Sequence, residues 1–194
     1  MIDPKHVTAC LITKEDAYPE EVLRTVQNFG FAAIIIYPRC PSIAGRLKIF
    51  EQATTPFLFT QDDDSICPLE VLFEEADPER IATVMGQNHI TWYASRPHCL
   101  MNWGAVFPKY TIERMKLYTD RYGEDAIYLR EFDRIFTGLN FPQKRLNYPV
   151  INLPIAFGPD RLSADPLHYE YMNTAETRLA ELSAMVSEEY PPQR

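Results

Sequence analysis

The stretch AGRLKIFEQATTPFLFTQDDD, residues 44–64, decides the fold that the sequence predicts. In its first half Leu47, Phe50 and Ala53 recur at helical spacing, which indicates a helix with one apolar face. Its second half, PFLFT, is a short apolar run typical of a strand that is buried on both faces. This strand leads into three consecutive aspartates. The stretch therefore predicts a helix, a buried strand and an acidic turn in succession.

The residues before this stretch show the same alternation. HVTACLIT (6–13) and FAAIIIYPR (31–39) are apolar, β-branched runs that predict buried strands, and residues 22–29 between them have the apolar spacing of a helix closed by Gly30. Strand, helix, strand, helix, strand is typical of a parallel sheet with helices on its faces. We therefore predict the α/β class, with a Rossmann-like, mostly parallel central sheet flanked by helices.

The second half of the chain is less regular, and no linker separates it from the first, so we predict a single compact domain over 1–194. Its predicted helices lie in CPLEVLFEEA (67–76), KYTIERMKLYTDRYG (109–123), EDAIYLREFDRIFTG (124–138) and TAETRLAELSAMVSEE (174–189). Its predicted strands lie in ITWYAS (90–95), LMNWGAVFP (100–108) and RLNYPVINLP (145–154), and AFGPDRLSADPLHYEYMN (156–173) is expected to be a loop.

Composition narrows the class of protein. Apolar residues make up 46% and charged residues 24% of the 194 residues, as in soluble globular proteins, and no run approaches a membrane span of about 20 residues. The N-terminus lacks the features of a secretory signal, so we expect a cytoplasmic protein, in the host cytoplasm if a phage encodes it. The four cysteines are scattered and are expected to be reduced and mostly buried. A net charge of −8 disfavours a nucleic-acid partner unless a local basic face compensates.

The aspartates are the first candidate site. Ligands bind beyond the carboxyl ends of the strands in such sheets, and Asp62 and Asp64 follow the third strand with the D-x-D spacing. Mg²⁺ and Mn²⁺ prefer oxygen ligands and usually take one or two protein carboxylates plus substrate phosphates. The alternative is a solvated acidic turn. The preceding apolar strand and the following Pro68 favour the metal site.

The sequence resembles the nucleotide-sugar-dependent glycosyltransferases of the GT-A fold, as a small member of bacterial or phage type. Five segments carry the resemblance in the family's order, namely HVTACLITKEDAYPEEVLRTV (6–26), AGRLKIFEQATTPFLFTQDDD (44–64), WGAVFPK (103–109), YGEDAIYLREF (122–132) and RLSADPLHYE (161–170). The resemblance implies a nucleotide-binding half at 1–68, an acceptor and catalytic half at 69–173, and a C-terminal helix and tail at 174–194.

The resemblance also implies a Mn²⁺ or Mg²⁺ ion at the donor diphosphate. Such an ion acts as a Lewis acid that neutralises the leaving group. Asp64 is expected to coordinate it directly, Asp62 to face the metal or the ribose, and Asp63 to face the donor sugar. His168 is implied as a further metal ligand, and its alternative is a packing histidine in a loop.

Two further residues are expected at the nucleotide. Thr13 ends the first strand and would meet it, and Arg46 could bind the diphosphate or the base, although a solvated helix charge is the alternative. Many relatives place an acidic residue at the end of the second strand, where this chain has Tyr37 and Arg39. A UDP-sugar donor is favoured, and this departure leaves the identity of the base open.

The second half supplies the candidates for catalysis and acceptor binding. Asp125, with Glu124 beside it, matches the family's acidic pattern at a helix start and is expected to accept the acceptor's proton, which would favour inversion of configuration. Helix capping is the alternative role. Trp103 and Gly104 are expected at the acceptor.

The sequence thus predicts a metal-dependent glycosyltransferase that moves a sugar from a UDP-sugar-type donor to a hydroxyl of a glycan, a protein or a hydroxymethylated DNA base. Two alternatives stay open. One is a nucleotidyltransferase of related architecture, although the first loop lacks glycine. The other is a non-catalytic protein that binds nucleotide sugars.

Overall fold

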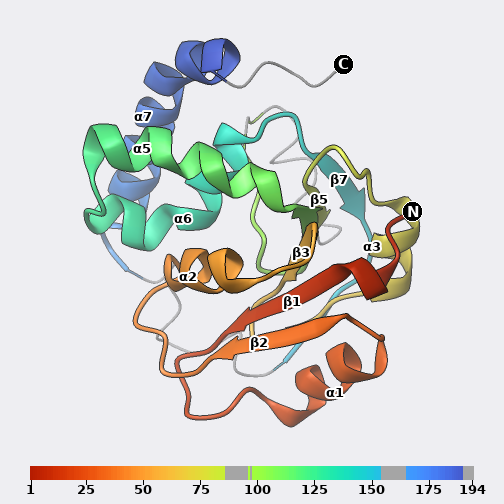
Figure 1. Cartoon of the computed structure of the whole chain (residues 1–194). Coiled ribbons are helices and arrows are strands. Elements are labelled where there is room, and N and C mark those ends of the chain that lie inside the picture. Colours follow the sequence, from red (N-terminus) through yellow and green to blue (C-terminus); the bar gives the residue numbers. More distant parts are fainter. Residues whose placement is uncertain (86–95, 97, 154–164, 190–194) are drawn as a thin grey trace.

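A six-stranded sheet forms the centre of the computed structural model, which describes residues 1–85, 96, 98–153 and 165–189 (Figure 1). Its order is β2-β1-β3-β6-β5-β7. The strands are β1 (Val7–Ile12), β2 (Ala33–Tyr37), β3 (Phe57–Thr60), β5 (Ala82–Met85), β6 (Ala105–Pro108) and β7 (Lys144–Asn147). β6 runs antiparallel to both of its neighbours, and the other three pairings are parallel. The predicted mostly parallel sheet is confirmed.

Helices cover both faces of this sheet. They are α1 (Glu20–Asn28), α2 (Gly45–Gln52), α3 (Leu69–Glu75), α5 (Met115–Tyr122), α6 (Ala126–Leu139) and α7 (His168–Glu189), with short 3-10 turns η1 (Pro4–His6) and η2 (Lys109–Arg114). A small two-stranded sheet pairs β4 (Ser65–Ile66) with β8 (Ile151–Asn152). Figure 1 shows α2, α5 and α6 on one side of the sheet and α1 on the other.

The side-chain alternation of the strands explains the two layers. All six residues of β1 are buried, and Cys10 joins an apolar cluster with Phe50 of α2 and Phe132 of α6. The neighbouring Leu11 joins a second cluster with Val22 of α1. Successive residues of a strand point to opposite faces, so β1 is apolar on both. Because both faces of β1 are covered, its sequence is a continuous apolar run.

Three elements differ from the prediction. β5 lies inside the sheet between β6 and β7, although no strand is predicted at its residues. β2 was expected to be buried, but it forms an edge of the sheet and its residues are partly exposed. α7 begins at His168 and not at residue 174, so the end of the expected loop is helical. The strand predicted at 90–95 and the first half of the loop predicted at 156–173 lie outside the described residues.

Candidate active site

The three aspartates occupy the turn between β3 and β4. Main-chain bonds fix both ends of this turn. The Asp62 N–H donates to the carbonyl oxygen of Asn102 at 2.8 Å, and the Leu153 N–H donates to the carbonyl oxygen of Asp64 at 2.7 Å. Ser65 Oγ donates to the same Asn102 oxygen at 3.0 Å. The turn is therefore held between the segment before β6 and the residue after β8.

Thr13 lies beside this turn, as its place at the end of β1 predicts. Its buried hydroxyl donates to Asp63 Oδ2 and accepts the N–H of Glu15 at 3.1 Å. β1 and β3 are parallel neighbours, so their carboxyl ends meet at one edge of the sheet. The structure therefore joins the first loop of the chain to the aspartate turn. Asp63 is oriented by this bond.

Arg46 is the buried partner of Asp62. Its side chain is 0% exposed, and its Nη2 donates to Asp62 Oδ1. The Nη1 atom donates to both carboxylate oxygens of Asp133, at 2.5 and 2.7 Å. Burial opposes the charge of Arg46, but Asp133 and Asp62 outweigh this and raise the pKa of the guanidinium above its usual value. The alternative of a solvated helix charge is wrong for Arg46.

Asp64 differs from the other two aspartates. In the described part of the chain no side chain bonds to its carboxylate, whereas Thr13 binds Asp63 and Arg46 binds Asp62. Burial, followed by the charges of Asp62 and Asp63, raises the pKa of Asp64 to about 6. Burial also raises the pKa of Asp63, against the bond from Thr13. The turn thus carries negative charge that a cation would stabilise.

A divalent ion fits this donor set. Half-buried carboxylate oxygens are the ligands that Mg²⁺ and Mn²⁺ prefer, and one or two of them suffice where substrate phosphates supply the rest. Asp64 is the free ligand of the turn, and Asp62 adjoins it. Among the residues that the structure describes, no three His, Cys, Asp or Glu side chains form a group that could hold a metal ion alone. Asp64 and Asp62 could thus supply one or two carboxylate ligands to a divalent ion.

Two residues at this site were missed by the sequence reasoning. Tyr18 is buried, its hydroxyl donates to the carbonyl oxygen of Gln61 at 3.4 Å, and burial together with Asp62 and Asp63 raises its pKa. Asp133 reaches Arg46 from α6, 87 positions along the chain. Tyr18 stands just before the helix-starting Pro19, and no local pattern distinguishes Asp133 from other acidic residues of an amphipathic helix. Only the tertiary pairing identifies Asp133.

Asp125 and Glu124 precede α6, as predicted, and Asp125 caps the helix. Its Oδ1 accepts the Tyr128 N–H at 3.0 Å, and its Oδ2 lies 2.8 Å from Arg178 Nη1 on α7. Asp125 precedes Asp133, the partner of Arg46, by eight residues, which corresponds to a rise of about 12 Å along a helix. The two carboxylates therefore lie at different levels of α6. The capping role is confirmed. The catalytic roles of Asp125 and Glu124 stay predictions.

His168 is the first residue of α7 and contacts α6. Its Nδ1 lies 3.8 Å from Glu131 Oε1, and among the described residues that buried nitrogen has no hydrogen-bond partner. Glu131 breaks the helical geometry of α6, with φ −108° and ψ 22°. Its other oxygen accepts a bond from Arg134 Nε at 2.8 Å. The role of His168 as a metal ligand stays a prediction.

Trp103 and Gly104 lie just before β6. Trp103 is partly buried and packs against two apolar clusters, one that contains Cys67 and one that contains Cys99. Gly104 has φ +118°, and a Cβ there would lie 2.3 Å from Cys67 Sγ. Close packing therefore requires glycine at this position. Their contact with an acceptor stays a prediction.

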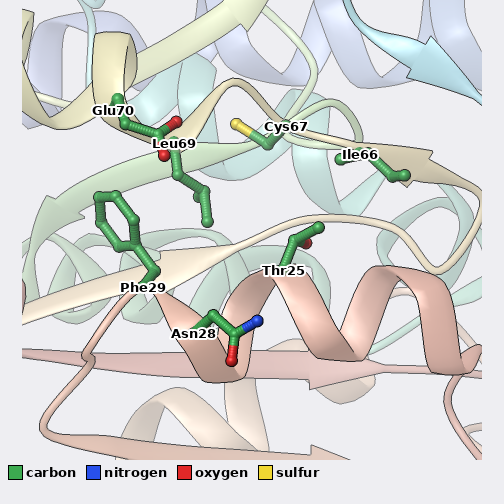
Figure 2. Close-up of a pocket in the computed structure, with 7 residues that line it drawn as sticks. All are labelled: Thr25, Asn28, Phe29, Ile66, Cys67, Leu69 and Glu70. Carbon is green, nitrogen blue, oxygen red and sulfur yellow. The ribbon is translucent and has the colours of Figure 1, made fainter.

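A pocket of about 290 Å³ lies next to the small sheet (Figure 2). It is lined by Thr25, Asn28 and Phe29 at the end of α1 and, on the other side, by Ile66, Cys67, Leu69 and Glu70. Figure 2 shows the Asn28 and Glu70 side chains at opposite walls. Asp62, Asp63 and Asp64 are not among its lining residues. The pocket is therefore separate from the aspartate turn.

The fold has solved counterparts. Glucosyl-3-phosphoglycerate synthase from Mycobacterium tuberculosis, crystallised with Mn²⁺, UDP-glucose and phosphoglyceric acid, superimposes with a TM-score of 0.53 at 12% identity, over 90% of this chain and 79% of that chain. The fold is that of a GT-A glycosyltransferase. The predicted fold class is therefore confirmed.

Two further comparisons give lower scores. A complex of the same Mycobacterium enzyme with Mg²⁺ and UDP has a TM-score of 0.48 at 12% identity, over 91% of this chain and 78% of that chain. A glycosyltransferase involved in glycosylation of the major capsid of PBCV-1 has a TM-score of 0.45 at 13% identity, over 88% of this chain and 90% of that chain. No protein-family model and no curated protein matches the sequence.

The described residues also bear on the membrane prediction. Across 1–85, 96, 98–153 and 165–189, the structure has no helix with the length and apolar character needed to span a bilayer. The expected cytoplasmic location stays a prediction.

Proposed function

We propose that the protein is a metal-dependent glycosyltransferase that uses a nucleotide-sugar donor, with a UDP-sugar favoured. The observation that carries this proposal is the aspartate turn, where Thr13 fixes Asp63, Arg46 fixes Asp62, and Asp64 keeps a carboxylate without a side-chain partner among the described residues. It lies at the carboxyl end of β3, the edge at which such sheets bind ligands. A shared fold alone does not decide function, so the site carries the argument.

Each aspartate has a separate role in this proposal. Asp64 holds a Mn²⁺ or Mg²⁺ ion, which when bound supplies Lewis-acid stabilisation of the departing diphosphate. Asp62 faces the ion or the ribose with Arg46 behind it, and Asp63 faces the donor sugar. Thr13 and Arg46 hold these carboxylates in place before the donor arrives. Such preorganisation lowers the cost of positioning at the moment of reaction.

The remaining assignments belong to the acceptor side. His168 would complete the metal shell, and Trp103 and Gly104 would contact the acceptor. Asp125, with Glu124, would take the proton of the acceptor hydroxyl and give inversion. Both oxygens of Asp125 already have partners, so this role needs its bond to Arg178 to open. The acceptor is a hydroxyl of a glycan, a protein or a hydroxymethylated DNA base.

A panel of nucleotide sugars tests the donor class directly. The melting temperature of the protein is measured with each UDP-, GDP-, TDP- and CMP-sugar, in Mn²⁺ and in EDTA. A ligand that binds only the folded state raises this temperature. We expect a rise with a UDP-sugar that requires Mn²⁺. If none of the donors raises the melting temperature in Mn²⁺, the proposed function is wrong.

A further inference from the structure

We propose that Asp133 is a positioning residue of the donor site, which acts through Arg46 to fix the side chain and the effective charge of Asp62. Asp133 does not belong to the aspartate turn. It lies on α6, in the half of the chain that follows β6, and the buried guanidinium of Arg46 links its carboxylate to that of Asp62. The predicted effect on ligand affinity rests on the proposed function. The predicted effect on the Arg46 side chain rests on the geometry alone.

The geometry of Arg46 is the first step. Its guanidinium is fully buried and divides its two terminal nitrogens between two carboxylates, with Nη1 to Asp133 and Nη2 to Asp62. The planar fork of arginine holds two such partners in a fixed relation, which a lysine ammonium would not. The position of Asp133 therefore determines where the Nη2 atom points. Asp62 follows that direction.

Asp133 is itself held firmly, which is the second step. The Met101 N–H donates to Asp133 Oδ2 at 3.3 Å, and the side chain of Asp133 is 7% exposed. One turn further along α6, the Thr137 hydroxyl donates to the Cys99 carbonyl oxygen at 2.7 Å and accepts the Cys99 N–H at 3.0 Å. The segment before β6 is thus bonded to α6 at two levels. Its Asn102 also accepts the N–H of Asp62.

The charges give the third step. Arg46 carries one positive charge and faces two carboxylates, of which Asp62 is the more exposed, with 30% of its side chain accessible. Asp133 shares the charge of Arg46, so Asp62 is only partly neutralised and keeps negative charge for a cation or a ribose hydroxyl. Without the charge of Asp133, Arg46 would neutralise Asp62 alone. Removal of one partner of a buried ion pair also leaves the other uncompensated.

The test compares three proteins by calorimetric titration of UDP in Mn²⁺. Asp133→Asn keeps the shape of the side chain and removes its charge. We expect it to weaken UDP binding at least tenfold, with its circular dichroism unchanged. Asn140→Ala is the matched control, because Asn140 is a buried anchor at the end of the same helix that donates to the carbonyl oxygens of Thr111 and Phe136 at 3.2 and 2.9 Å, and in the described structure it bonds to neither Arg46 nor Asp133. It should lower the melting temperature and leave the affinity within twofold of the parent.

A spectroscopic readout needs no ligand. Rotation of a guanidinium held by two carboxylates is slow, so the Nη1 and Nη2 atoms of Arg46 should give separate ¹⁵N signals in the parent. They should merge in Asp133→Asn and stay separate in Asn140→Ala. If Asp133→Asn does not fold, Arg46→Lys serves in its place in the titration, since it keeps the charge but loses the fork, and should show the same loss of affinity.

The outcomes separate the two proposals. If the parent does not bind UDP with Mn²⁺ while the Arg46 signals merge in Asp133→Asn, the donor assignment is wrong and the positioning role stands. Unchanged affinity and unchanged Arg46 signals in Asp133→Asn would overturn the positioning role. An equal loss of affinity in Asn140→Ala would also overturn it, because general destabilisation would then explain the effect.

Discussion

At the scale of single residues, the three aspartates of one turn are chemically different because their neighbours differ. Arg46 on α2 binds Asp62, and Thr13 at the end of the adjacent strand β1 binds Asp63. Asp64 has no side-chain partner in the described structure. Three adjacent carboxylates repel one another, and the raised pKa of Asp64 expresses that repulsion together with burial. The turn is therefore prepared for a cation.

His98 gives a pH-dependent prediction. Burial, then the charges of Arg134, Arg96 and Arg145, lowers the pKa of His98 from 6.5 to about 3. The unfolded chain therefore binds this proton first, and the stability that neutral His98 confers is complete above pH 6.5 and lost as the pH falls toward 3. The loss is at most about 1.4 kcal/mol for each pH unit.

The measurement is urea unfolding of the parent and of His98→Gln at pH 7.5, 6 and 5. Glutamine does not titrate, so the free energy of unfolding should fall less with decreasing pH in the variant than in the parent. Carboxylates far from His98 contribute equally in both proteins and cancel in the difference, whereas Glu176, 3.6 Å from His98 Nε2, belongs to the surroundings that the variant changes. Parallel pH profiles would show that His98 does not carry this dependence.

The residues of the site show how far sequence reasoning reaches. Thr13, Arg46 and the aspartates could be predicted because parallel strands bring their carboxyl ends to one edge, and the structure brings these residues together. Asp133 could not be predicted, because its partner is 87 positions away and only the packing of α6 over α2 joins them. Local patterns carry no information on such a pairing.

At the scale of elements, Gly104, just before β6, occupies a position where close packing and backbone conformation both require glycine. A Cβ at Gly104 would lie 2.3 Å from the sulfur and 2.9 Å from the Cβ of Cys67, and its φ of +118° disfavours any other residue. Gly104→Ala should therefore lower the free energy of unfolding by about 3 kcal/mol, from strain and overpacking together. Chemical denaturation followed by tryptophan fluorescence measures this loss.

Gly30→Ala is the matched control for this prediction. Gly30 also has a positive φ, of +90°, but no atom lies within 4 Å of the position of an added Cβ. Only backbone strain opposes the alanine, at a cost of about 1 kcal/mol. Equal losses in the two variants would mean that Cys67 does not restrict Gly104.

Elements were predictable where the apolar period was long and clear. β1, β3 and the helices between them follow from continuous apolar runs and helical spacing. β5 (ATVM) was missed because alanine and threonine weaken its apolar run, whereas β3 (FLFT), which has the same length, begins with three large apolar residues. β2 was wrongly predicted to be buried because an apolar run does not distinguish an edge strand from a central one. α7 starts earlier than predicted because Asp165 and Pro166 form a turn that leads into the helix.

At the scale of the whole molecule, three apolar clusters bury the four thiols, with Cys10 and Cys40 in one, Cys67 in a second and Cys99 in a third. Cys10, Cys40, Cys67 and Cys99 are free and buried. Burial raises the pKa of Cys10 to about 12 and that of Cys99 to about 11, and it raises the pKa of the other two thiols as well. Since the thiolate is the reactive form, the folded protein should react very slowly with thiol reagents.

Labelling with an aromatic disulfide reagent tests this prediction. Less than one thiol per molecule should react within minutes in buffer, and four should react in 6 M guanidinium chloride. The rate in buffer should follow the opening of the structure and not the reagent's own reactivity. Rapid labelling of one or more cysteines in the folded protein would contradict the predicted burial.

The central claim is that Asp64 holds the divalent ion on which donor use depends, and release of UDP from a UDP-sugar tests it most directly. The rate is measured in Mn²⁺ and in EDTA for the parent, for Asp64→Asn, and for Glu70→Gln as a control carboxylate on α3. We expect Mn²⁺-dependent release of UDP in the parent and in Glu70→Gln, and a rate at least 100-fold lower in Asp64→Asn. Equal Mn²⁺-dependent rates in Asp64→Asn and the parent would contradict it.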